Sequence, residues 1–238
     1  MRRIKKCQVP ECLQAFIDGQ LAIEPEPVNL TYEDFRGKAE LMAILTDEQF
    51  GLCGYTGAPV DERVSQLKAV NAQVIFANHI EHLKCQKTCR EELNARGREC
   101  GRDLGEDLDY LNLIAALEVR GAETERFGAV IKANKRLPIL PTQEGCNERF
   151  VFRENDGGTE GLDDEANTSI AVLALNHDTL KDWRSAAIAA WLDPNIVQTL
   201  DDFQDVLRVM TEPRNKRLPE YAYVIESIAR QYLNEAHV

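Results

Sequence analysis

Apolar residues recur at three- and four-residue spacing in several parts of the chain, a pattern typical of amphipathic helices. The first such part begins at about Tyr32 and continues to Leu45. The last third of the chain repeats the pattern, and prolines separate several of its segments, as they do between helices. We predict helices at roughly 167–175, 177–192, 199–210 and 218–234.

Two shorter apolar runs lie in the middle of the chain. Residues 74–76 form a β-prone run that leads into residues 78–82. Residues 111–117 form an apolar segment that carries one polar residue, Asn112. A polar stretch separates the two runs, and we predict an inserted loop there, at about 83–108.

Local motifs predict several turns. Residues 149–153 alternate as a half-exposed strand does, and the Asn-Asp-Gly-Gly sequence at 155–158 accepts positive φ, which predicts a hairpin or sharp turn. Thr46 with Gln49 resembles a capping box, which predicts that another short turn opens there. Residues 53–57 are then expected in a tight turn that follows a helix.

Composition limits the class of protein. The 238 residues can bury a substantial core without disulfides, and the seven cysteines, an odd number, are expected to be reduced. We find neither a long uncharged apolar run nor a secretory signal, so we expect a cytoplasmic protein. The net charge of -12 excludes a protein whose whole surface grips nucleic acid.

Candidate chemistry centres on the sequence His79-Ile80-Glu81-His82. Hydrolysis of a phosphodiester needs a base to activate water and a divalent metal to neutralise developing charge. In a strand, His79 and Glu81 share one face and His82 points to the other, whereas a turn would let all three converge. Two histidines at this spacing also occur without function, so the spacing alone leaves both interpretations open.

Asn112 is the second candidate. An amide inside an apolar run costs about 1 to 3 kcal/mol unless it is hydrogen-bonded, so it is expected to have a partner. A loop-bonding or capping asparagine would satisfy the same pattern, and the residue by itself does not separate these roles.

The order of these pieces resembles that of the HNH endonucleases of Septu-type and retron-linked phage-defence systems, the PtuB family. The resemblance spans most of the chain, and its individual motifs are short. It rests on Met1, Ile4, Lys5, Pro10 and Leu13; residues 49–55; residues 80–82; residues 110–113; residues 132–134, Leu137 and Pro138; Cys146, Arg149 and Phe150; the turn at 156–157; and residues 173–176, Leu180 and Arg184.

The resemblance implies a ββα-metal core, a hairpin followed by a helix. It makes Glu81 a ligand of a divalent metal, Mg²⁺ or Mn²⁺, and His82 the general base that deprotonates the attacking water. Asn112 would orient either His82 or the hairpin loop. His79 would be a second metal ligand or would help to hold the scissile phosphate.

The resemblance also assigns roles after the hairpin. Lys132 would contact phosphate, and Asn134 would support the site. Ala129 falls near the place of the third metal-binding side chain, so the resemblance leaves that ligand open among Asn134, Glu125 and His79.

The chain departs from the family at the structural zinc, which four cysteines commonly hold beside the hairpin. Cys53 remains, but Thr56 stands where its partner would be, and residues 115–117 and 127–128 lack the other thiolates. We therefore expect no structural zinc, with Thr56, Ala116 and Phe127 packing the same space. A competing zinc site, H-x2-C-x3-C-x10-C, is formed by His82, Cys85, Cys89 and Cys100.

Charge patterning bears on partners. The dense basic clusters are Arg2, Arg3, Lys5 and Lys6, and later Arg214, Lys216 and Arg217; either could touch phosphate or face a partner. The acidic surplus suits docking onto a basic partner. The resemblance implies an ABC-type, SMC-like ATPase of the PtuA type, and in retron-linked versions a reverse transcriptase with its RNA-DNA product.

The sequence thus predicts an α+β, mainly helical protein. Residues 1–30 form an N-terminal arm, with a linker or extended stretch at the prolines of 24–27. Residues 31–165 form the nuclease domain, and residues 166–238 a C-terminal helical bundle. The predicted function is a metal-dependent HNH endonuclease acting on DNA or RNA, such as tRNA. The alternatives are a degenerate HNH scaffold that binds without cleaving, and a zinc-binding adaptor.

Overall fold

The computed structural model describes residues 1–23, 30–68, 73–95 and 104–235. Helices and two small antiparallel sheets make up the described fold, which confirms the predicted α+β, mainly helical class. The α-helices are α1 Glu11–Leu21, α2 Lys38–Glu48, α3 Gln86–Ala95, α4 Ala129–Lys132, α5 Asp164–Val172, α6 Asp178–Trp191, α7 Leu200–Thr211 and α8 Ala222–Glu235. The strands are β1 Ile75–His82, β2 Leu113–Arg120, β3 Phe150–Phe152 and β4 Thr159–Gly161.

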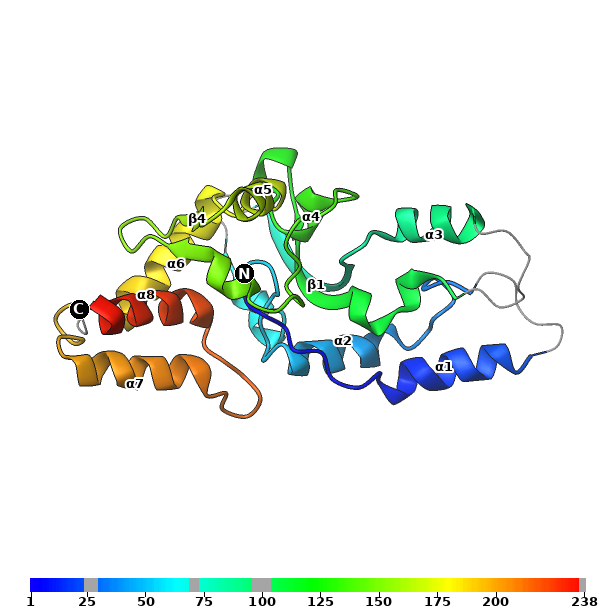
Figure 1. Ribbon diagram of the computed structural model, residues 1–238, viewed down its shortest axis with the longest axis horizontal. Helices are drawn as coiled ribbons and strands as arrows, with labels where there is room; N and C mark the ends of the chain where they lie inside the picture. The colour runs from blue at the N-terminus through cyan, green and yellow to red at the C-terminus, as the bar shows by residue number, and fades with distance from the viewer. Residues whose placement is uncertain (24–29, 69–72, 96–103, 236–238) are drawn as a thin grey trace.

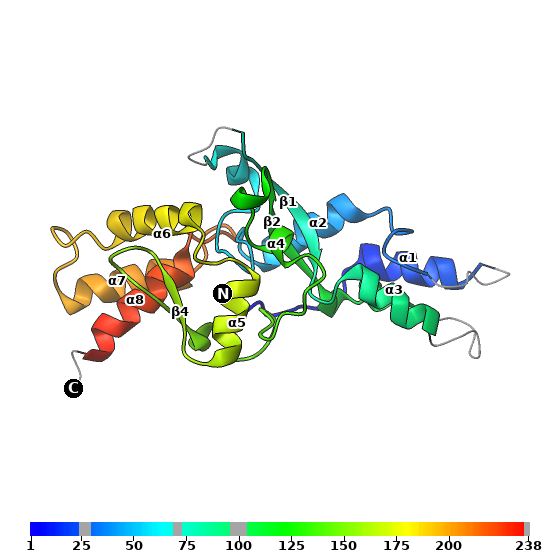
Figure 2. The same cartoon turned by 90° about the horizontal axis from the view of Figure 1, so that it is seen from above.

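The hairpin of β1 and β2 lies in the middle of an elongated molecule (Figure 1). Helices α1 and α3 extend from it at one end, and α6, α7 and α8 form the other end, an arrangement that Figure 2 shows from above. Within residues 1–23, 30–68, 73–95 and 104–235, no helix combines the length and apolar character needed to cross a membrane.

The N-terminal arm is partly helical. Pro10 precedes α1 with φ -60°, which suits the start of a helix, and Leu13 is fully buried. The rings of Phe16 and Phe35 meet edge to face at 5.3 Å between centroids and thereby join α1 to the segment before α2. The proline stretch at 24–27, predicted as a linker, lies outside the described residues.

The central hairpin is antiparallel and pairs His79 with Ala116 and His82 with Leu113. Residues 75–76 of the β-prone run and the site sequence after them belong to one strand, β1, which is partly exposed as far as Glu81. Strand β2 is buried from Leu113 to Leu117, where its sequence is continuously apolar. The hairpin therefore has β2 as its core strand and β1 as the strand that reaches the surface.

The prediction that Thr46 and Gln49 open a new turn is wrong. Thr46 lies inside α2, and Gln49 ends that helix as its C-cap. The buried Gln49 amide instead bonds to Ala115 of β2: its Nε2 donates to the Ala115 carbonyl at 2.8 Å, and its Oε1 accepts from the Ala115 N–H at 2.7 Å. Buried backbone groups must be paired, and the Gln49 side chain pairs those of Ala115 on the edge of β2 that does not face β1. This long-range contact outweighs the local preference for a helix cap.

We expect Gln49→Ala to destabilise the protein by about 2 to 4 kcal/mol, because it leaves the buried Ala115 N–H without its acceptor and the Ala115 C=O with the long 3.5 Å bond from the Gly54 N–H. Urea unfolding measures the change. Gln14→Ala is the matched control, since Gln14 is exposed and its side chain bonds Asp18 within α1; it should change the free energy of unfolding by less than about 0.5 kcal/mol. Equal losses in the two variants would contradict the role given to Gln49.

The C-terminal third confirms the sequence prediction. Strands β3 and β4 pair as the predicted hairpin, and Gly157 in its turn has φ 64°. Helices α5 to α8 fall close to the four predicted segments. In the helical pair α7 and α8, the rings of Phe203 and Tyr232 stack at 4.5 Å between centroids, so the amphipathic faces pack on each other.

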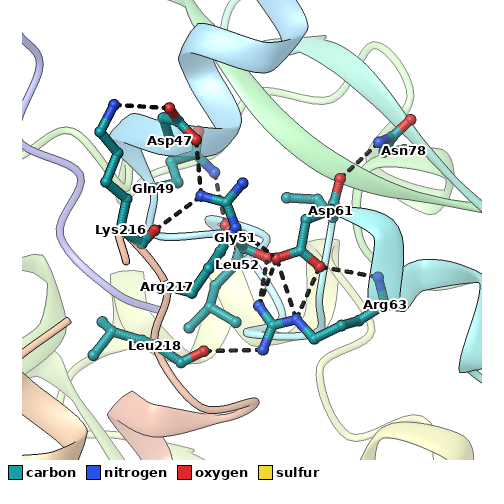
Figure 3. A network of polar contacts seen from close by, with 11 residues as sticks. Asp47, Gln49, Gly51, Leu52, Asp61, Arg63, Asn78, Lys216, Arg217 and Leu218 are labelled. Atoms are coloured by element: carbon teal, nitrogen blue, oxygen red, sulfur yellow. Dashed lines mark hydrogen bonds and ion pairs between the residues drawn. The ribbon is translucent and has the colours of Figure 1, made fainter. Parts of the chain in front are cut away.

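A network of charges ties the segment before α8 to the end of α2 (Figure 3). The Asp61 carboxylate, with a side chain only 2% exposed, pairs with Arg63 Nη2 at 2.8 Å and Arg217 Nε at 3.0 Å. Arg217 also bonds Asp47 at 2.8 Å, and Lys216 reaches the other oxygen of that carboxylate at 3.1 Å. Arg217, for which the sequence left open a contact with phosphate or with a partner, is thus paired with Asp47 and Asp61 inside the fold.

Candidate functional site

The alternation of strand β1 sorts the candidate residues onto two faces. The side chains of His79 and Glu81 lie together, with His79 Nε2 3.4 Å from Glu81 Oε2. His82, the last residue of β1, points to the opposite face and is 5% exposed. The strand interpretation of the sequence is therefore confirmed, and the alternative in which all three side chains converge in a turn is wrong.

Glu81 is held by a lysine from the helix that follows the hairpin. Lys132 ends α4, and its Nζ donates to Glu81 Oε1 at 2.8 Å and to the His82 carbonyl at 3.0 Å. The Lys132 side chain is 1% exposed and that of Glu81 13%, so the ion pair is buried. Tyr55, a residue that sequence reasoning gave no role, donates from its hydroxyl to the same Glu81 oxygen at 3.4 Å.

These neighbours keep Glu81 ionised. Burial on its own raises the pKa of Glu81, but the hydrogen bond with His79 and the charge of Lys132 together lower it below its ordinary value. Burial raises the pKa of Tyr55 well above its ordinary value, and the adjacent carboxylate adds to that effect. At neutral pH, Glu81 is a carboxylate that faces an ammonium and a neutral phenol.

Local sequence places Lys132. Gly128 precedes α4 with φ 67°, a backbone conformation that a residue with a side chain adopts only with strain. The Gly128 N–H donates to the Leu173 carbonyl at 2.8 Å, which fixes where the short helix begins. In this arrangement Lys132 turns inward to Glu81, whereas the sequence assigned it to a phosphate.

His82 is enclosed by parts of the chain on both sides of the hairpin. Its Nε2 lies 3.1 Å from the Asp107 carbonyl, and its Nδ1 lies 3.2 Å from the side-chain amide of Gln86. The ring of Tyr32 meets the imidazole edge to face at 4.6 Å. Because a carbonyl only accepts, Nε2 carries the proton and Nδ1 holds the basic lone pair. Gln86 and Asp107 belong to the predicted inserted segment.

Burial lowers the pKa of His82 to about 4. The unfolded chain has the ordinary value of 6.5, so between these two pH values only the unfolded state takes up the proton. As the pH falls from 7.5 to 4.5, we expect His82 to remove about 3 kcal/mol of stability. Urea unfolding of wild type and His82→Asn at both pH values isolates this contribution, and equal losses in the two proteins would contradict it.

Asn112 fastens the loop that leaves β1. Its Oδ1 accepts from the Lys84 N–H at 2.7 Å, and its Nδ2 donates to the carbonyls of Lys84 and Glu106 at 3.1 Å each. The asparagine stands in an apolar run because its side chain supplies hydrogen-bond partners to these three backbone groups. Asn112 is expected to orient either His82 or the hairpin loop, and these contacts join it to the loop.

Asn134 and Glu125 lie apart from this face. Asn134 is exposed and, with Asn112, lines a cavity of about 780 Å³ that neither Glu81 nor His79 reaches. Glu125 ends the short helical turn Glu123–Glu125 after β2. Within the described part of the chain, no group of three His, Cys, Asp or Glu residues could hold a metal ion.

The donor set fits a hydrated divalent cation. Glu81 Oε2 and His79 Nε2 are close enough to contact one ion, and His79 Nδ1 is buried with no hydrogen-bond partner among the described residues. Mg²⁺ keeps several waters and commonly takes one or two protein ligands with substrate phosphates, which suits two donors. A structural zinc needs four and does not suit them.

The residues at the positions of the family's zinc cysteines are packed. Thr56, Ala116 and Phe127 are all at most 1% exposed, and Phe127 contacts the ring of Trp183 edge to face. The Cys53 sulfur accepts a hydrogen bond from the Leu117 N–H at 3.3 Å, which gives it a partner inside the protein. Cys53, Ala116 and Phe127 belong to the hydrophobic core of the described residues, and Thr56 is buried as well.

The competing cysteine site is described only in part, because Cys100 lies outside the described residues. Cys85 bonds Thr88, and Cys89 donates toward the Lys84 carbonyl, while both nitrogens of His82 have the partners given above. Each of these groups therefore already has a hydrogen-bond partner in the fold.

No family model and no curated protein matches the chain. The chemistry of the hairpin is therefore inferred from its own side chains. The contacts of Tyr55 with Glu81 and of Asp107 with His82 join residues about 25 positions apart, so no sequence pattern indicated them. Gln86 follows His82 by four residues at the start of a helix, and this spacing was the one sequence signal for its contact.

Proposed function

We propose that this chain is a metal-dependent HNH-type endonuclease that hydrolyses phosphodiester bonds in DNA or RNA, including tRNA. The main support is the succession of Glu81 and His82 at the end of β1, with α4 delivering Lys132 to Glu81 and Asn112 fastening the loop beyond. A hairpin followed by a short helix is the order that the resemblance to HNH endonucleases implies for a ββα-metal core, and it supports the proposal.

In this proposal His82 is the general base. Its Nδ1 accepts a proton from the attacking water, while the Asp107 carbonyl holds Nε2–H and keeps the ring oriented as the imidazolium forms. Glu81 and His79 would hold a divalent cation, which would supply positive charge for the phosphate and the leaving oxygen. Because His82 lies on the opposite face of β1, the proposal requires the end of this strand to rearrange before the base and the cation can act on one phosphate. Lys132 fixes the Glu81 carboxylate in place.

The enclosure of His82 fits an effector that stays inactive until a partner acts on it. Water reaches Nδ1 only when Gln86 leaves it, and Gln86 begins α3 in the inserted segment. We propose that an ABC-type, SMC-like ATPase licenses this movement within a phage-defence complex. A retron reverse transcriptase with its RNA-DNA would hold the complex closed.

A second candidate, a scaffold that binds without cleaving, is favoured by a different observation. The Lys132 ammonium already neutralises Glu81, and His82 faces away from that carboxylate across the hairpin. A protein that had abandoned metal chemistry would retain this pairing for stability alone.

Cleavage assays of the chain with its ATPase partner separate the two candidates. Plasmid DNA, single-stranded DNA and bulk tRNA are incubated with Mg²⁺ or Mn²⁺, and with a chelator as control. The nuclease predicts cleavage of at least one substrate that the chelator abolishes. Absence of metal-dependent cleavage under every condition, with the complex intact, would replace the nuclease by the scaffold.

A further inference from the structure

The two basic clusters of this acidic chain meet at one cavity, although more than two hundred residues separate them. The cavity measures about 990 Å³ and lies along the N-terminal segment, beside the end of α2. Asp47 and Glu48 are the acidic residues that line it. The cationic residues that line it are Arg2, Arg3, Lys5, Lys6 and Lys216. In a chain of net charge -12, this is a local excess of positive charge.

The N-terminal segment presents part of this charge to solvent. Ile4 is buried, and its N–H donates to the Pro141 carbonyl at 2.7 Å, which anchors the segment. Arg3 and Lys5, on either side of Ile4, are exposed. Arg3 pairs with Glu144, but both side chains are solvated, and exposed ion pairs contribute little. Both cations can therefore turn to a phosphate at small cost.

The two remaining cations of this segment are partly buried and differ in their partners. Lys6 is committed to Glu48 at 2.7 Å and to the Leu113 carbonyl at 2.9 Å. Arg2 packs over the Phe50 ring at 5.1 Å, its Nη1 is buried, and the charge of Glu226 acts on its guanidinium inside the protein. Arg2 therefore adds positive charge to the wall of the cavity, and the exposed cations are the ones that can contact an anion.

Lys216 brings the second cluster to the same place. Its side chain is 73% exposed and shares the Asp47 carboxylate with Arg217. Because Arg217 alone can keep that carboxylate paired, Lys216 is available to an external anion. Exposed cations thus reach the cavity from two segments, and Arg2, Phe50 and Ile4 also line it.

We propose that this cavity binds the phosphate backbone of a nucleic-acid strand. Tyr110 lines this cavity, and the neighbouring residues Asp109, Leu111 and Asn112 line the separate 780 Å³ cavity, whose lining contains none of His79, Glu81 and His82. That second cavity mixes the cations Lys84, Lys135 and Arg136 with the carboxylates of Glu92, Glu106 and Asp109. This inference deepens the proposed function and rests on it for the path of the strand, whereas binding requires no cleavage.

The test measures binding of a fluorescent 20-nucleotide single strand by anisotropy, with a chelator present and at several salt concentrations. The variant Arg3→Gln/Lys5→Gln/Lys216→Gln should bind about ten- to a hundredfold more weakly than wild type in 0.1 M salt. The slope of log affinity against log salt should become shallower by about 2, since each lost phosphate contact on a single strand removes roughly 0.7.

The matched control is Lys87→Gln/Arg208→Gln/Arg230→Gln, which removes the same charge from exposed helical positions elsewhere. Its affinity should stay within about threefold of wild type. Equal weakening by the two triple variants, or no binding by wild type even at low salt, would overturn the proposal. Tighter binding of a polyglutamate probe of matched charge would assign the cavity to an acidic protein segment and would also overturn it.

The same series keeps this inference distinct from the proposed function. His82→Asn should bind the strand as wild type does, because His82 lies outside the cavity. Specific loss of binding in the Arg3, Lys5 and Lys216 variant, in a protein that never cuts, would support the cavity and refute the nuclease. Unchanged binding in that variant, in a protein that does cut, would refute the cavity alone.

Discussion

His82→Asn should reduce metal-dependent cleavage by the assembled complex about 10² to 10⁴-fold, the usual contribution of a general base. Asparagine retains a polar side chain for Asp107 and Gln86 but offers no basic nitrogen to water. The rate is measured on the substrate that wild type cuts best, under single-turnover conditions, and the thermal midpoint is recorded beside it.

The control for this variant is His177→Asn. His177 caps α6 by accepting from the Thr179 N–H, a role that asparagine performs well, and it lies outside the hairpin. This variant should cut within about threefold of wild type. If His82→Asn cuts as fast as His177→Asn, His82 is not the base and the proposed mechanism is wrong.

Lys132→Met should lower the free energy of unfolding by about 3 to 5 kcal/mol, because it leaves Glu81 as a buried carboxylate without its cation. The His82 carbonyl loses a donor in the same variant. Methionine retains most of the volume of the lysine stem, so the loss reports charge more than packing. Urea unfolding at pH 7.5 gives the magnitude.

A double-mutant cycle isolates the pair. Glu81→Gln/Lys132→Met removes both charges and should recover at least about 2 kcal/mol relative to Lys132→Met alone. Lys181→Met serves as the control, since its pair with Asp178 is exposed, and should change the free energy of unfolding by less than about 1 kcal/mol. A double variant as unstable as Lys132→Met would mean that Lys132 acts through packing instead.

The contacts of Lys132 and of His82 set two conditions for metal chemistry at this site. Lys132 supplies a fixed positive charge to one oxygen of Glu81 and leaves the other oxygen beside His79. A cation bound there would therefore be held by little protein charge, and its affinity should depend strongly on the phosphate that arrives with the substrate. Gln86 and Asp107 set a second condition, since they enclose His82 and would have to leave it before water could reach the imidazole.

Much of the secondary structure follows from the sequence because its causes are local. Helical spacing in the last third predicted α5 to α8, and the Asn-Asp-Gly-Gly turn predicted the hairpin of β3 and β4. The period of two in a strand also placed His79 with Glu81, and His82 opposite them. The Thr46 and Gln49 motif failed, because the buried edge of β2 claimed the Gln49 side chain.

The amino-acid sequence by itself determined that His79 and Glu81 share one face and His82 the other if residues 79–82 form a strand. Only the tertiary structure decided that they do form a strand, that Lys132 neutralises Glu81 and that Gln86 and Asp107 enclose His82. It alone brought Lys216 to the same cavity as Arg2. Periodicity is a property of neighbouring residues and can be read along a chain. Ion pairs, burial and cavities join distant segments, and their energies depend on water that folding removes.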